Sequence, residues 1–168
     1  YTRLTDAGLG CPDWPGCYGF LKVPHQEHHI AQAEQAFPER PLEPHKAWNE
    51  MVHRYFAGSL GLLIAAIFFS ALINKQSPKL LPSVLLALVV FQAALGMWTV
   101  TLNLLPLVVM GHLLGGFTIL SLLAIHWLRL HPQCLVAEPE LVSLKPFAAL
   151  VLVVLVSQIA LGGWTAAN

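Results

Sequence analysis

Two histidines and one glutamate stand at or near the starts of long apolar segments. His53 stands two residues before the start of a segment, residues 55–74, that contains no Asp, Glu, Lys or Arg, and His112 lies inside another such segment. If both segments enter a bilayer from the same side, the two imidazoles reach similar depth. Facing imidazoles inside a helix bundle are suitable axial ligands for haem iron. Glu50 precedes His53 by three residues and therefore shares its helix face.

Each of these residues also has an ordinary structural explanation. His112 could hydrogen-bond to a neighbouring helix, and Glu50 could be a solvated residue ahead of its helix. A histidine within an apolar span is costly and tends to be functional, so iron ligation is the favoured interpretation. Arg54 could bind a haem propionate or extend to the membrane surface. Small residues near the two histidines would leave room for a flat macrocycle or for ordinary helix contact: Ala57, Gly61, Gly111, Gly115 and Gly116.

The elements that position these residues are predicted to be membrane-spanning helices. The segment from residue 80 to residue 128 contains no charged residue, and residues 146–168 contain none either. A helix needs about 20 apolar residues to cross a bilayer core, so the first of these segments is long enough for two crossings. Pro106 suits the first turn of the second crossing. We therefore expect spans near residues 53–73, 80–102, 106–128 and 147–165.

These spans predict an all-α, polytopic membrane helix bundle. The mean hydropathy of +0.63 and the hydrophobic content of 56% agree with this fold class. A soluble helical core is disfavoured because buried soluble helices rarely run so far without a charge. The net charge of zero gives no indication of a nucleic-acid partner.

Charged residues between the spans predict the orientation in the membrane. Lys75 lies in the first short loop, and Arg129 and Lys145 flank the second, so both loops are expected to face the cytoplasm. Residues 1–52 would then form an outer loop, although they carry several basic residues of their own. Cys11 and Cys17 lie in this loop, where an oxidising exterior would allow them to form a disulfide.

The expected organisation follows from these boundaries. Residues 1–52 form the outer loop, 53–128 three spans, 129–146 a cytoplasmic loop and 147–168 a fourth span. The sequence QAALGMWT at residues 92–99 is echoed by QIALGGWT at residues 158–165, which is a modest indication of an internal repeat. The first residue is not Met, and the fourth span ends with the chain, so we expect further sequence on both sides.

Four motifs in order along the chain resemble the haem A synthase family. They are TRLTDAGLGCPDWPGC at residues 2–17, EMVHRY at 50–55, LGMWTVT at 95–101 and GHLLGG at 111–116. Each motif alone is weak, but together they are specific. The resemblance implies an eight-span enzyme of two similar four-helix halves. This chain would be the first half without its first helix, followed by the helix that opens the second half.

The resemblance also implies an activity and a set of site residues. The family oxidises the C8 methyl of haem O to the formyl group of haem A, which cytochrome oxidase requires. Residue matching assigns roles as follows: His53 and His112 as axial ligands of the haem O/haem A site, Glu50 as the catalytic carboxylate, Cys11 and Cys17 as a disulfide, and Arg54 and Arg3 as possible propionate contacts. A haem b site is expected in the remaining half, and no other metal site is expected.

The implied surroundings are those of a multi-pass protein of the bacterial inner membrane. The expected partners are haem O as substrate, membrane lipids, haem O synthase, cytochrome oxidase assembly factors and a second copy of the chain. Two other functions use the same residues. A b-type electron-carrying cytochrome would keep the histidine pair without needing Glu50, and a non-enzymatic assembly module would use the histidines only to join helices.

Overall fold

The computed structural model describes residues 8–75, 77–134 and 143–167, and Arg3 lies outside these ranges. Every regular element in the described residues is helical. In chain order these are α1 (Glu27–Ala36), α2 (Pro44–Ile73), α3 (Leu80–Thr101), α4 (Pro106–Leu130), the short 3-10 helix η1 (Pro132–Cys134) and α5 (Lys145–Ala167). The predicted all-α class is therefore confirmed.

Four of the helices are long and apolar enough to cross a membrane, namely α2, α3, α4 and α5. The predicted spans are confirmed, and the chain is an integral membrane protein. The beginning of α2 differs from the prediction, because the helix starts at Pro44 rather than at residue 53. The earlier start has two causes. Pro44 occupies the first turn, where its missing N–H costs nothing, and Ala47 and Met51 are buried against the folded outer loop.

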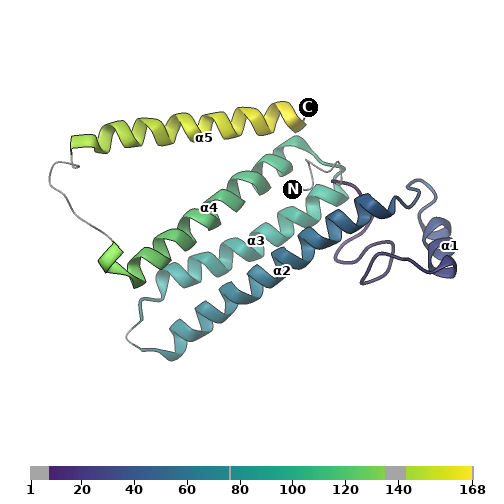
Figure 1. Ribbon diagram of the computed structural model, residues 1–168, viewed down its shortest axis with the longest axis horizontal. Helices are drawn as coiled ribbons and strands as arrows, with labels where there is room; N and C mark the ends of the chain where they lie inside the picture. Colours follow the sequence, from purple (N-terminus) through teal and green to yellow (C-terminus); the bar gives the residue numbers. More distant parts are fainter. Residues whose placement is uncertain (1–7, 76, 135–142, 168) are drawn as a thin grey trace.

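The spans α2, α3 and α4 lie side by side with alternating direction, and α5 runs along α4 (Figure 1). The last turns of α2 and α4 and the first turns of α3 and α5 are at one end of the bundle (Figure 1). The outer loop and the α3–α4 turn are at the other end, where the Arg40 guanidinium donates to the side-chain oxygen of Asn103. That the first of these two ends faces the cytoplasm stays a prediction.

The centre of the bundle is apolar. Ile64 of α2, Leu85 of α3 and Ile119 of α4 form one buried cluster. Most other large apolar side chains of the spans are exposed, as expected for helices that face lipid. The apolar part of α5 has no buried residue, so this helix presents nearly all of its surface outward.

The outer loop has a small core of its own, built around Cys11, Cys17 and Tyr18. The Tyr18 hydroxyl donates to the carbonyl of Pro41 over 3.1 Å, and burial raises the pKa of this phenol, with the charge of Glu43 acting in the same direction. The Asp13 carboxylate accepts from the backbone N–H groups of Tyr18 and Gly19. The loop is therefore a folded cap on the first turns of α2.

Candidate functional site

His53 of α2 and His112 of α4 face each other across the bundle. Their ring centres are 6.4 Å apart and their ring planes are inclined at 82°. Two imidazoles that bind one metal ion from opposite sides, each at about 2 Å, place their ring centres about 6 Å apart. The predicted facing arrangement is therefore present. The ligation of iron remains a prediction, and the separation fits it.

His112 fits closely against α3. A Cβ atom on Gly96 would lie 3.3 Å from the Cε1 atom of His112, so the glycine provides the space that the imidazole occupies. The Nδ1 atom of His112 is buried and has no hydrogen-bond partner among the described residues. A buried unpaired nitrogen is unfavourable in an isolated protein. Its presence here fits a side chain whose polar partners are completed when a ligand binds.

The small residues near the histidines divide into two groups. Gly111 packs against Leu95, and Gly115 packs against Gln92, so these two glycines serve the contact between α3 and α4. Gly116 has no neighbouring atom within 4 Å of the position that its Cβ would occupy. Of the glycines predicted to leave room for a macrocycle, Gly116 faces open space among the described residues, and a Cβ atom on Gly61 would lie 3.9 Å from Cγ2 of Val89 of α3.

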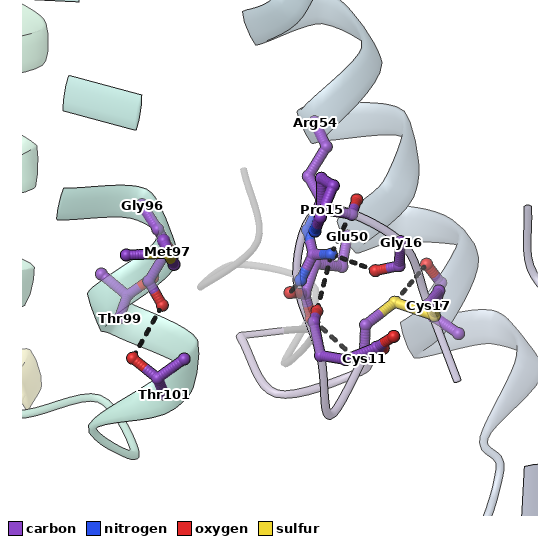
Figure 2. Close-up of polar contacts among 12 residues, drawn as sticks. Cys11, Pro15, Gly16, Cys17, Glu50, Arg54, Gly96, Met97, Thr99 and Thr101 are labelled. Carbon is purple, nitrogen blue, oxygen red and sulfur yellow. Dashed lines mark hydrogen bonds and ion pairs between the residues drawn. A yellow bond between two sulfur atoms is a disulfide. The ribbon is translucent and has the colours of Figure 1, made fainter. Parts of the chain in front are cut away.

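Glu50 is 4% exposed and is held by the outer loop. The backbone N–H of Cys11 donates to Oε2 of Glu50 over 3.0 Å, and the Arg54 guanidinium forms an ion pair with Oε1 (Figure 2). The carboxylate is thus fixed on both oxygens, one helical turn before His53. It is oriented by the loop and by its own helix rather than by solvent.

Arg54 clamps the loop to α2. One nitrogen of its guanidinium, Nη1, donates to the carbonyl of Asp13 over 2.9 Å, to that of Pro15 over 3.3 Å and to that of Gly16 (Figure 2). The other terminal nitrogen pairs with Glu50. Contact between Arg54 and a haem propionate stays a prediction, because these observed partners are all protein groups.

Cys11 and Cys17 are joined as a disulfide with their Cα atoms 4.9 Å apart, within the usual range of about 4.4–6.8 Å. Both residues are fully buried. Gly10, next to Cys11, lies against the backbone of α2, and a Cβ atom there would be only 2.7 Å from the amide nitrogen of Ala47. The glycine therefore permits the close approach that brings the Cys11 N–H to Glu50.

Figure 2 draws Gly96, Met97, Thr99 and Thr101 of α3 on a separate helix, apart from the group formed by Glu50, Arg54 and the outer loop. The hydroxyl of Thr99 donates to the carbonyl of Gly96 over 2.7 Å, and that of Thr101 donates to the carbonyl of Met97 over 3.2 Å. Both bonds stay within α3. The contribution of the α3 motif at residues 95–101 to the histidine pair is therefore Gly96, whose missing side chain accommodates His112.

One residue of the site was not predicted from sequence. Gln92 of α3 donates from Nε2 to the backbone carbonyl of His112 over 3.0 Å. The only available sequence signal was the repeated motif, in which Gln92 has a counterpart at Gln158. The Glu50–Arg54 pair could have been expected from its four-residue spacing on one helix, which favours ion pairs.

Comparison with known proteins identifies the family. The whole chain, residues 1–168, matches the COX15-CtaA family, described as cytochrome oxidase assembly protein. The chain belongs to this family. A "Heme A synthase" from Shewanella oneidensis is 56% identical over 169 residues, which cover 100% of this chain and 51% of that protein. The chain thus spans about half the length of this curated relative. No solved structure matches the chain significantly.

Family membership confirms the resemblance found in the four motifs. It also agrees with the expectation that the chain is half of a longer repeated protein, and it does not favour a b-type carrier cytochrome. Within residues 8–75, 77–134 and 143–167, no group of three or more His, Cys, Asp and Glu side chains could hold a metal ion.

Proposed function

We propose that this chain forms the haem O-binding half of a haem A synthase, a membrane oxidoreductase that converts the C8 methyl of haem O to the formyl group of haem A. The observation that carries the proposal is the pairing of His53 and His112, with ring centres 6.4 Å apart, in a chain of this family. The relative named as a heme A synthase supports the choice of reaction.

The histidine pair suits haem as substrate. If both imidazoles bind the iron, no coordination position is left for O₂, so the haem held here is the molecule that is oxidised rather than an oxygen activator. The oxidation then requires an electron acceptor, which is usually a separate cofactor. We place that acceptor, and the expected haem b, in the remaining half of the protein.

In this proposal Glu50 acts on the substrate close to the methyl group. Its two oxygens are held by the N–H of Cys11 and by Arg54, and each oxygen retains a further lone pair. The carboxylate can use this capacity to accept a proton or to stabilise positive charge that develops as the methyl is oxidised. Arg54 and the loop fix where this charge lies, which is the usual requirement for electrostatic stabilisation.

The proposed setting extends the same assignment. Cys11 and Cys17 would be bonded in the native protein on the outer face of a bacterial inner membrane, and Lys75 and Arg129 would face the cytoplasm. Haem O synthase, cytochrome oxidase assembly factors and a second copy of the chain are the proposed protein partners. Arg3 stays a candidate propionate contact outside the described residues.

The test is the pigment of the full-length protein expressed together with a source of haem O. Haem is extracted from the purified protein and identified by mass. We expect haem O and haem A, which share the farnesyl chain and differ at the methyl position. Protein that carries only haem b, and that leaves haem O unchanged during turnover, would instead identify a carrier cytochrome. Protein without a Soret band would indicate a helix-joining role for the histidines.

A further inference from the structure

Two buried residues of the described chain carry polar side chains, Glu50 and Gln92. Glu50 is accounted for by its bonds to the outer loop. Gln92 is 7% exposed and lies within the membrane-spanning helix α3. A polar side chain in such a helix is costly to bury and tends to be functional. Its position against His112 indicates what that function is.

Gln92 and His112 interlock through two glycines. The amide of Gln92 lies against Gly115 of α4, where a Cβ atom would be 2.9 Å from the Cδ atom of the glutamine. The imidazole of His112 lies against Gly96 of α3, one turn after Gln92. Each side chain therefore occupies the space left by a glycine of the other helix, and this arrangement fixes the rotation of α4 about its axis.

A hydrogen bond secures the same contact. The Nε2 atom of Gln92 donates to the backbone carbonyl of His112 over 3.0 Å. This bond acts on the ligand residue itself, because a backbone carbonyl moves with the Cα–Cβ bond of its own residue. Interhelical hydrogen bonds of this kind stabilise helix association in membranes.

Two polar atoms in the contact between Gln92 and His112 take no part in this hydrogen bond. The Oε1 atom of Gln92 and the Nδ1 atom of His112 are both buried, and neither has a hydrogen-bond partner in the part of the chain that the structure describes. When a histidine binds a metal through Nε2, its Nδ1 carries a proton and donates to a nearby acceptor, which fixes the ring and strengthens it as a ligand. The unpaired amide oxygen is an acceptor of the required type on a side chain already in contact with His112.

We propose that Gln92 is a positioning residue for His112: its Nε2 holds the backbone carbonyl of His112, and its Oε1 accepts a hydrogen bond from Nδ1–H when Nε2 of His112 binds the haem iron. This inference rests on the proposed function, since it assumes that His112 is an axial ligand. The Gln-x-x-x-Gly spacing of residues 92–96 recurs in the sequence at residues 158–162 of α5.

The experiment compares substitutions in the full-length protein loaded with haem. Gln92→Met keeps the length and approximate volume of the side chain but removes both the donor and the acceptor. Gln92→Glu keeps an oxygen acceptor. Thr118→Val is the control, because this exposed α4 hydroxyl bonds only within its own helix, to the carbonyl of Leu114 over 2.9 Å. The measurements are the haem dissociation constant and the midpoint reduction potential of the haem.

We expect Gln92→Met to weaken haem binding about 10-fold or more, as is typical when the partner of a metal-bound histidine is lost. We also expect an upward shift of the potential, because a histidine without an acceptor for its N–H donates less charge to the iron and stabilises the ferric state less. Gln92→Glu should return the potential to the wild-type value or below it, and Thr118→Val should change neither quantity.

Two results would overturn the inference: a Gln92→Met protein with wild-type potential, or a Gln92→Glu protein with the potential of Gln92→Met. If Gln92 only packs against His112, one of these two results is expected. Packing alone does not depend on whether the side chain ends in a hydrogen-bond acceptor, as in Glu, or in a thioether, as in Met. His112→Ala separates this inference from the proposed function. If His112→Ala retains haem at the wild-type level, the ligand assignment itself is wrong. If it loses haem while Gln92→Met changes nothing, only the role of Gln92 is wrong.

Discussion

The adjacent glycines of α4 allow the packing of the site to be tested with a single methyl group. Gly115 and Gly116 have the same helical context, but a Cβ on Gly115 would overlap the amide of Gln92, whereas a Cβ on Gly116 would meet nothing within 4 Å. We expect Gly115→Ala to displace Gln92 from His112 and to loosen the contact between α3 and α4. We expect Gly116→Ala to leave the bundle intact.

The magnitude follows from what the methyl group removes. Loss of one interhelical hydrogen bond costs about 0.6 kcal/mol, and up to about 1.7 kcal/mol. Insertion of an extra carbon into a packed contact adds about 1–3 kcal/mol, at the lower end here because the displaced amide is the flexible end of a side chain. The gain in helix propensity, at most about 1 kcal/mol, is common to both variants. Gly115→Ala should therefore be about 2 kcal/mol less stable than Gly116→Ala, roughly a 30-fold difference in the unfolding equilibrium.

The assay is reversible unfolding of the full-length protein in mixed micelles, followed by the Soret band and by helix content. The difference between the two variants is the quantity to be measured, so effects of the detergent on both variants cancel. Equal stability of Gly115→Ala and Gly116→Ala would refute the interlocking of Gln92 with Gly115. Greater loss of stability in Gly116→Ala would place the macrocycle or another helix against Gly116 instead.

Three further predictions concern the site and its orientation. Glu50→Gln should keep the haem and halt its oxidation, so that mass analysis of the pigment finds haem O in place of haem A; haem A formed at the wild-type rate would remove Glu50 from the mechanism. Arg54→Met should release the outer loop, since four hydrogen bonds are lost together, and proteolysis of residues 11–17 should become at least about 10-fold faster, while unchanged cleavage would mean that the disulfide loop is held without the clamp. A cysteine introduced at position 75 should be labelled from the cytoplasmic side alone, and labelling from outside would reverse the topology.

The spans could be predicted because charge-free length is a property of sequence alone. The start of α2 could not, since its first turns are buried by the outer loop rather than by lipid. Ala47 and Met51 contact residues more than twenty positions earlier in the chain, and no local pattern indicates that contact. The predicted boundary at residue 52 therefore lies within α2, which begins at Pro44.

The similar depth of the two histidines was predictable, because both lie near the starts of spans that run in the same direction; that their helices bring them face to face was not. The groups that orient the histidine pair could not be predicted from the sequence. Gln92 bonds to the backbone carbonyl of His112. Every residue has a backbone carbonyl, so a sequence does not show which one is bonded. Arg54 was predicted to contact a haem propionate, which stays a prediction. Three of its hydrogen-bond partners are loop carbonyls, whose position depends on the folded loop.

The length of α2 has a consequence for how the site responds to the membrane. Its 30 residues extend about 45 Å, whereas the hydrocarbon core of a bilayer is about 30 Å thick. The first turns, which carry Glu50, therefore project into the headgroup region, with His53 at the boundary. A helix adjusts to bilayer thickness by tilting, and here one continuous helix carries both the loop and the histidine. The tilt of α2, and with it the distance and angle between the two histidines, should therefore depend on the acyl-chain length of the surrounding lipids.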